Sequence, residues 1–213
     1  MSDFDDITTA HLRQRLNETR RPVDPTDVIL PIGSDEWPYR LKQRLTGTLK
    51  PAGVLIPVIE RESTGLSLLL TQRSAALKHH AGQVSFPGGR WEPNDTDIVA
   101  TALRETHEEV GIAPGDITVI GYMSPMPTIT GYAVTPVIGV VCADIELHLD
   151  RTEVEYAFEV PLPFLMNPDN QKMVERDVEG TAVVMAEYHY DDQRIWGATA
   201  FIIQEFIKII EKE

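Results

Sequence analysis

The sequence predicts an α/β chain in which helices cover both faces of a mixed β-sheet, an α/β/α sandwich. Three observations indicate this fold class. Short runs rich in aliphatic and β-branched residues recur along the chain, an amphipathic helix with an acidic face lies between them, and a strongly apolar helix follows the last of them. Strands that alternate with one central and one terminal helix pack as layers around a sheet.

The N-terminal region reads as a short preface to one domain. Leucines recur at helical spacing within residues 8–20, and two prolines follow, so we expect a helix and then a linker. A chain of 213 residues is long enough to bury one sizeable core. We therefore predict a helix and linker over residues 1–50 and the main domain over residues 51–213.

Four runs in the first two thirds of the chain have strand character. Residues 53–60 and 66–72 are separated by a turn-forming segment and predict a hairpin. Residues 117–122 and 133–142 also read as strands. The Pro- and Thr-rich segment 124–131 joins them, and it fits either a border of the substrate pocket or an ordinary surface connection.

The C-terminal part of the chain predicts a hairpin and a helix. Strand-like residues 183–190 and 194–196 flank a short polar turn, and an apolar helix is expected over residues 198–210. Its core-facing side chains are expected to be Phe201, Ile202, Phe206, Ile207 and Ile210. Ile203 and Ile209 widen that apolar face, which suits core packing and also suits a homodimer interface.

The residues from Arg104 to Ile112 form the most informative stretch of the chain. At about 100° per residue, Glu105, Glu108 and Glu109 share one stripe of the predicted helix, and apolar side chains occupy the opposite face. Carboxylates at this spacing repel one another and offer the oxygen ligands that Mg²⁺ and Mn²⁺ prefer. One interpretation is a divalent-metal site completed by a pyrophosphate substrate, and the other is a solvated acidic helix face.

A glycine turn before this helix favours the metal site. The segment Phe86-Pro87-Gly88-Gly89 precedes the helix, and paired glycines let the backbone approach a ligand or metal closely. Asp95 and Asp97 then offer side-chain oxygens for the helix start. The order of glycine turn, acidic spacer and Arg-Glu-x-x-Glu-Glu-x-Gly resembles the box of the Nudix hydrolases, which cleave nucleoside diphosphates linked to another group.

Within that family, the chain is similar to the coenzyme A diphosphatases. Its box has Asp95 where a glutamate is usual, eight residues rather than seven before Arg104, and Thr106 in a usually apolar position. An inserted residue is a feature of the coenzyme A subgroup, whose preceding segment reads L-L-T-x-R-[SA]-x3-R-x3-G-x3-F-P-G-G. Residues 69–89 match that segment except at Lys78, which keeps the positive charge but loses the bidentate guanidinium fork.

The resemblance implies the Nudix fold, and it implies hydrolysis of coenzyme A or its thioesters to 3′,5′-ADP and 4′-phosphopantetheine with Mg²⁺ or Mn²⁺. By the same resemblance, Arg104 would orient a box carboxylate through a charge-assisted hydrogen bond. The metal ligands that it implies are Glu105 and Glu109 first, then Glu108, and a carbonyl of Gly88 or Gly89.

The sequence leaves more than one candidate for the general base and for the substrate. Nudix enzymes draw the base from the box or from a later loop, which gives Glu108 or Glu153 here. A broader hydrolase of ADP-ribose or NADH is a second enzyme reading, and a noncatalytic nucleotide sensor of the same fold is a third. The intact set of Arg104 and the three glutamates argues against the sensor.

The charge balance narrows the choice of partner. With 33 acidic and 19 basic residues the formal net charge is −14, which disfavours nonspecific binding to nucleic acid. A small anionic substrate such as coenzyme A or a related nucleotide then needs local positive potential, for which Arg73, Lys78, Arg90 and bound metal are the candidates. The alternative for each side chain is an ordinary solvated surface residue, and for Arg90 this is the favoured interpretation. Gly88 and Gly89 are expected to contribute backbone contacts to the substrate.

Location is predicted from three simple features. Cys142 is the single cysteine, so an intrachain disulfide is excluded, and its place in an apolar run predicts a small buried side chain. The acidic N-terminus lacks the apolar core of a signal peptide, and no apolar stretch reaches membrane-spanning length. We therefore expect a cytoplasmic protein without a membrane partner.

Overall fold

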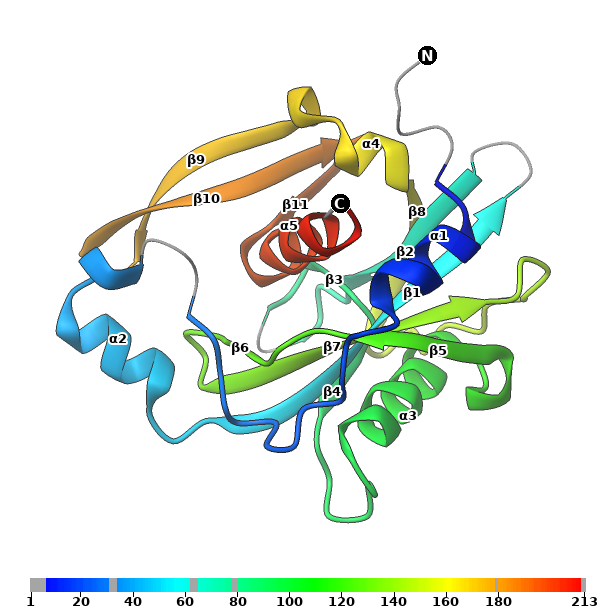
Figure 1. Ribbon diagram of the computed structural model, residues 1–213, viewed down its shortest axis with the longest axis horizontal. Coiled ribbons are helices and arrows are strands. Elements are labelled where there is room, and N and C mark those ends of the chain that lie inside the picture. Colours follow the sequence, from blue (N-terminus) through cyan, green and yellow to red (C-terminus); the bar gives the residue numbers. More distant parts are fainter. Residues whose placement is uncertain (1–6, 31–33, 62–64, 78–79, 179, 212–213) are drawn as a thin grey trace.

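The structure is a computed structural model with two β-sheets and five α-helices in its described part (Figure 1). Lys78, one of the predicted substrate-binding residues, lies outside the described residues. The described ranges are 7–30, 34–61, 65–77, 80–178 and 180–211.

Three helices lie where the sequence predicts them, at the two ends of the chain and at the acidic segment. Two more, α2 and α4, were not predicted. The helices are α1 (Thr9–Leu16), α2 (Tyr39–Thr46), α3 (Ile98–Val110), α4 (Leu162–Met166) and α5 (Gly197–Glu211). The strands are β1 (Lys50–Arg61), β2 (Gly65–Arg73), β3 (Val84–Ser85), β4 (Gly88–Arg90), β5 (Ile117–Tyr122), β6 (Met126–Pro127), β7 (Tyr132–Val141), β8 (Val154–Pro161), β9 (Gln171–Val178), β10 (Thr181–Tyr190) and β11 (Gln193–Trp196).

The main sheet has eight strands. It contains both parallel and antiparallel pairs, so it is a mixed sheet, as the sequence predicts. β1 and β2 form the predicted antiparallel hairpin, and β1 also runs parallel to β7 over ten residue pairs. β8, which was not predicted, pairs antiparallel with β2 and places Val154 opposite Arg73. The short strand β4 pairs with the first half of β1, so the glycine turn is itself part of the sheet.

The two faces of the main sheet belong to two hydrophobic clusters. Leu55 and Ile59 of β1 pack with Ala102 and other side chains under α3. The alternate residues, represented by Ile56, pack in a larger cluster that includes Phe206 of α5. Because successive side chains of a strand point to opposite faces, this alternation separates an α3 face from an α5 face.

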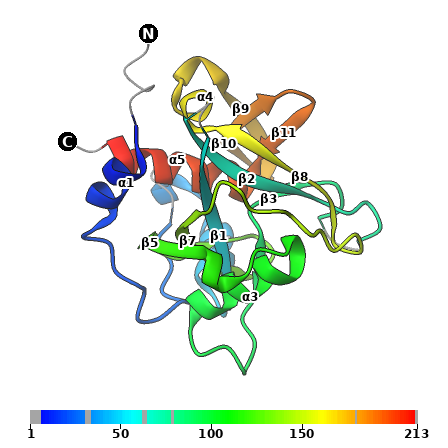
Figure 2. The ribbon, with the colours of Figure 1, turned by 90° about the vertical axis from the view of Figure 1, so that its right-hand side faces the viewer.

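The C-terminal helix fills the space between the main sheet and a second sheet made of β9, β10 and β11 (Figures 1 and 2). Tyr188 of β10 is buried in the same cluster as the apolar side chains of α5. Ile203, for which core packing and a homodimer interface were both considered, is fully buried within the chain, in the same cluster as Tyr188. Ile209 is half-buried.

The N-terminal helix is packed into the larger cluster. Leu12 and Leu16 of α1 are buried there, and the hydroxyl of Thr19 accepts a hydrogen bond of 3.1 Å from the backbone N–H of Tyr122. The division of the chain at residue 50 stays a prediction. The segment before β1 contributes side chains to the core.

Cys142 is exposed, so the prediction of a buried cysteine is wrong. The reason is that β7 ends at Val141, and the chain leaves the sheet at the next residue. In the described part of the chain, no helix combines the length and apolar character needed to cross a bilayer.

Close contact between β1 and α3 depends on Gly53. A methyl group built at Gly53 would lie 2.6 Å from the carbonyl oxygen of Ile98 and 3.1 Å from the backbone nitrogen of Ala102. We expect Gly53→Ala to lower the free energy of unfolding by about 1–3 kcal/mol, because the helix must move away from the sheet. Urea denaturation measures the change.

The matched control for this substitution is Gly115→Ala, because nothing lies within 4 Å of a methyl group at that glycine. The control is expected to unfold at nearly the wild-type urea concentration. Equal stabilities of the two variants would contradict the tight contact at Gly53.

Candidate functional site

Side chains at the start of the acidic helix α3 and within it form hydrogen bonds to its backbone. Asp97 is the N-cap, and its carboxylate accepts hydrogen bonds of 2.9 Å from the backbone N–H groups of Val99 and Ala100. Thr106, in a position where the family usually has an apolar residue, is fully buried and donates its hydroxyl proton to the carbonyl of Ala102 at 2.7 Å. The polar residue is therefore satisfied inside the core.

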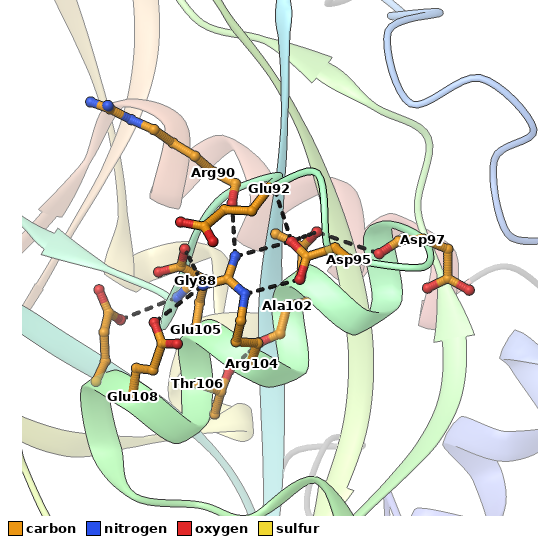
Figure 3. A network of polar contacts seen from close by, with 12 residues as sticks. Gly88, Arg90, Glu92, Asp95, Asp97, Ala102, Arg104, Glu105, Thr106 and Glu108 are labelled. Atoms are coloured by element: carbon orange, nitrogen blue, oxygen red, sulfur yellow. Dashed lines mark hydrogen bonds and ion pairs between the residues drawn. The ribbon is translucent and has the colours of Figure 1, made fainter.

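Arg104 is the centre of the polar network (Figure 3). Its Nε and Nη2 atoms donate to both oxygens of Asp95 at 2.9 and 3.0 Å, which is a bidentate ion pair. Its Nη1 atom donates to Glu105 at 3.0 Å and to Glu108 at 3.1 Å, and Nη2 also donates to the carbonyl of Arg90 at 3.0 Å. One guanidinium thus joins the glycine turn, the spacer and the helix.

The extra residue before Arg104 does not prevent this pairing. Asp95 has a side chain that is only 5% exposed, and it also accepts hydrogen bonds from the hydroxyl of Thr101 and the backbone N–H of Glu92. The hydrogen bonds from Arg104 hold the pKa of Asp95 well below its usual value, at about 2. Asp95, which stands where the box usually has a glutamate, therefore pairs directly with Arg104.

Glu109 is the most buried carboxylate of the site. Its side chain is 3% exposed, and it accepts a hydrogen bond of 3.1 Å from the backbone N–H of Gly88 and one of 3.3 Å from Arg73. Burial raises its pKa to about 7; Gly88 and Arg73 lower it, while the charges of Glu105 and Glu153 raise it further. A buried carboxylate of this kind is stabilised as an anion when a cation binds beside it.

Glu105 faces the glycine turn. A methyl group at Gly89 would lie 2.3 Å from a carboxylate oxygen of Glu105, so only glycine leaves room for this side chain. Burial raises the pKa of Glu105, and the ion pair with Arg104 acts in the opposite direction. The backbone of the turn and the carboxylate therefore lie directly against each other.

The two candidates for the general base lie at the rim. Glu108 has a side chain that is 57% exposed and is held by Arg104. Glu153 is exposed in the turn before β8, and its backbone carbonyl accepts a hydrogen bond of 2.7 Å from the N–H of Ser74. Because the charge of Glu153 raises the pKa of both Glu105 and Glu109, its carboxylate acts on the same site.

The residues fit a divalent cation bound together with substrate. Within the described ranges, no three His, Cys, Asp or Glu side chains already converge as a complete cage. Such a cage is unnecessary for Mg²⁺, which commonly takes one or two carboxylates and fills its shell with water and substrate phosphate. Glu105 and Glu109 provide crowded, partly desolvated carboxylates, and the absence of a side chain at Gly89 lets the turn lie directly against the carboxylate of Glu105.

The remaining predicted residues divide between the two sides of the sheet. Arg73 lies in the site, since it pairs with Glu109. The side chain of Arg90 instead points away from the carboxylates (Figure 3) and lies over the ring of Tyr132 at 5.4 Å. Tyr132 was missed by sequence reasoning because its approach to Arg90 depends on the pairing of β4, β1 and β7.

The segment 124–131 lies beside the C-terminal helix. Its first three residues line an apolar cavity of about 290 Å³ together with Ile29, Phe201 and Ile209. Met126 belongs to the hydrophobic cluster of the α5 face, so this cavity is on the opposite side of the sheet from the carboxylates.

Comparison with known proteins identifies a family. A family model described as NUDIX domain matches residues 49–186. A protein of Escherichia fergusonii described as an uncharacterized Nudix hydrolase NudL is 42% identical over 156 residues, which is 73% of this chain and 80% of that protein. A protein of the same description from Photorhabdus laumondii is 38% identical over 169 residues, covering 79% and 89% of the two chains.

Solved structures give more distant likenesses. A NUDIX hydrolase from Alicyclobacillus acidocaldarius is 15% identical with a TM-score of 0.49, covering 75% of this chain and 91% of that one. The NUDIX domain of NrtR from Shewanella oneidensis, complexed with ADP ribose, is 17% identical with a TM-score of 0.42, covering 62% and 82%.

The pair of Asp95 and Arg104 predicts a pH-dependent contribution to stability. Since the folded-state pKa of Asp95 is lowered from 3.8 to about 2, its contribution is present above pH 4 and is lost as the pH falls toward 2. We expect Asp95→Asn to lower the free energy of unfolding by about 2 kcal/mol at pH 7. Urea denaturation between pH 3 and pH 7 in EDTA measures it.

The control for this prediction is Asp116→Asn, which changes an exposed aspartate outside the network. The difference between Asp95→Asn and wild type is expected to shrink as the solution is acidified, and the control is expected to stay close to wild type. A constant deficit for Asp95→Asn from pH 3 to pH 7 would show that the ion pair is not its source.

Proposed function

Because this chain belongs to the Nudix hydrolase family, we propose that it hydrolyses the diphosphate bond of coenzyme A and its derivatives. The family acts on diphosphate-containing, nucleotide-linked compounds with the help of divalent cations. The products of the proposed reaction are 3′,5′-ADP and 4′-phosphopantetheine, or its acyl form. Mg²⁺ or Mn²⁺ is the proposed metal.

One contact carries the proposal: the ion pair between Arg73 and Glu109. Arg73 belongs to the upstream segment that resembles the coenzyme A subgroup, and Glu109 belongs to the box. The pairing of β2 with β8 brings Glu153 next to Arg73 as well. The upstream segment therefore supports the substrate choice from within the same site that supports the hydrolytic chemistry.

The proposed roles follow from burial and charge. Glu105 and Glu109 would hold the metal with the Gly88 or Gly89 carbonyl, and a bound divalent cation neutralises phosphate charge and activates water. Arg104 fixes the orientation of Glu105 by its charge-assisted hydrogen bond. Arg73 provides positive charge for the diphosphate beside Glu109.

Glu108 and Glu153 remain the two proposed sources of the general base. Both are exposed at the rim of the site, where water can reach them. Glu108 is additionally tied to Arg104 by an ion pair of 3.1 Å, which holds its carboxylate beside the proposed metal ligands. A base must lie within hydrogen-bond reach of the attacking water, and both positions offer a carboxylate on the solvent side.

A substrate panel tests the proposed function. Coenzyme A, an acyl-coenzyme A, ADP-ribose and NADH are incubated with Mg²⁺ or Mn²⁺, and the products are identified by chromatography. We expect the highest kcat/KM for the coenzyme A compounds. Equal turnover of ADP-ribose would support the broader hydrolase instead, and tight binding without any turnover would support a sensor.

The role of Glu109 is tested by Glu109→Gln, which keeps the size of the side chain and removes the charge. We expect kcat with Mg²⁺ to fall at least about a hundredfold, because a metal ligand is lost. The melting temperature in EDTA is expected to stay near wild type, since burial already disfavours the charged form of Glu109.

The matched control for Glu109→Gln is Glu175→Gln, at an exposed position of β9. It is expected to retain wild-type turnover. A Glu109→Gln enzyme with a nearly wild-type rate would remove Glu109 from the metal site.

A further inference from the structure

Arg90 is fixed close to the catalytic carboxylates but on the other face of the sheet. It follows Gly89 directly, and its carbonyl accepts the hydrogen bond from Arg104. In the β4–β1 ladder, Gly89 pairs with Gly53 and Arg90 with Ala52. A Cβ atom at Gly53 or Gly89 would point at α3. Because successive residues of a strand alternate between faces, the side chain of Arg90 extends from the opposite face of the sheet.

Tyr132 lies on that same face. The parallel pairing of β1 with β7 places Val134 opposite Ala52 and Tyr132 opposite Lys50, two residues earlier. Val134 packs in the cluster of the α5 face, and the strand period of two puts Tyr132 beside it. The position of the Arg90 guanidinium over the Tyr132 ring agrees with this register.

Arg90 differs from the neighbouring arginines Arg73 and Arg104 in its ion pairing. Arg104 is neutralised by Asp95, Glu105 and Glu108, and Arg73 pairs with Glu109. In the part of the chain that the structure describes, no carboxylate lies within ion-pair distance of Arg90. In a chain with net charge −14, this guanidinium beside the site is available to an anion.

We propose that Arg90, stacked on Tyr132, binds a second anionic group of the substrate, a phosphate monoester away from the scissile diphosphate. The cation–π contact places the guanidinium over the ring, and the N–H groups of the guanidinium can donate to phosphate oxygens. This inference rests on the proposed function. Coenzyme A carries such a group, the 3′-phosphate of its ribose, whereas ADP-ribose and NADH do not.

In this role Arg90 determines substrate specificity, and the carboxylates on the α3 face of the sheet carry out the hydrolysis. Its contribution is expected only with substrates that carry the extra phosphate. The substrate would extend around β4, which among the described strands pairs with β1 alone, with its diphosphate at the carboxylates and its monoester at Arg90. Tyr132 is a positioning residue, since it acts through the guanidinium.

The test compares ligands that differ only in this phosphate. Binding of adenosine 3′,5′-bisphosphate and of AMP is measured by calorimetry in EDTA, and kcat and KM are measured with coenzyme A and dephospho-coenzyme A. For Arg90→Ala we expect about tenfold weaker bisphosphate binding and about tenfold higher KM for coenzyme A, the order of one charge-assisted contact. The kcat values, AMP binding and KM for dephospho-coenzyme A are expected to stay unchanged.

Three further variants separate this role from a general effect. Arg13→Ala removes an exposed arginine of α1 and is expected to change none of these values. Tyr132→Phe keeps the ring and is expected to bind like wild type, whereas Tyr132→Leu is expected to lose part of the preference for the bisphosphate. Arg90→Ala leaves the backbone carbonyl in place, so the melting temperature is expected to be unchanged.

The proposal is overturned if Arg90→Ala weakens both nucleotides equally or neither of them. A wild-type enzyme that cleaves neither coenzyme A nor dephospho-coenzyme A would instead overturn the proposed function. In that case calorimetry still decides about Arg90, because a bisphosphate preference that disappears in Arg90→Ala supports the anion site without any turnover.

Discussion

The guanidinium of Arg104 determines where the other groups of the site lie. It binds Asp95 in the spacer, Glu105 and Glu108 on the helix, and the carbonyl of Arg90 in β4. Its acidic partners raise the pKa of Arg104, so it stays charged throughout the physiological range. Without this cation, carboxylates one helical turn apart would repel one another, and the spacer would lose its attachment to the helix.

Much of the fold could be predicted from local patterns, and the failures share a physical cause. The β1–β2 hairpin, the acidic helix and the apolar helix have clear periods of two or 3.6 residues. β8 was missed because its strand is defined by pairing with β2, far away in the sequence. β9 was missed because its polar and charged residues give a weak apolar signal, and its pairing with β10 makes it a strand. In each case a distant partner supplies what the local sequence does not.

The candidate site was predictable as a set of residue types but not as a set of partners. The helical period alone places Glu105 and Glu109 near each other, and the glycine turn indicates where the backbone approaches them. The pairing of Arg73 with Glu109 depends on tertiary structure, because β2 reaches α3 through the pairing of β2 with β1 and the packing of β1 on α3. Likewise, the separation of Arg90 from Arg104 onto the other face follows from strand register, which composition does not reveal.

The position of α5 between the two sheets affects the order in which the chain can fold during synthesis. The layer between α3 and the main sheet uses residues that leave the ribosome early, such as Leu55, Ala102 and Val137. The layer on the other face cannot close until α5 has been made, because Phe206 and Ile203 fill its centre. A nascent chain therefore exposes one apolar face of its sheet from the synthesis of β8 until α5 is complete, and exposed apolar surface of this kind favours aggregation in that interval.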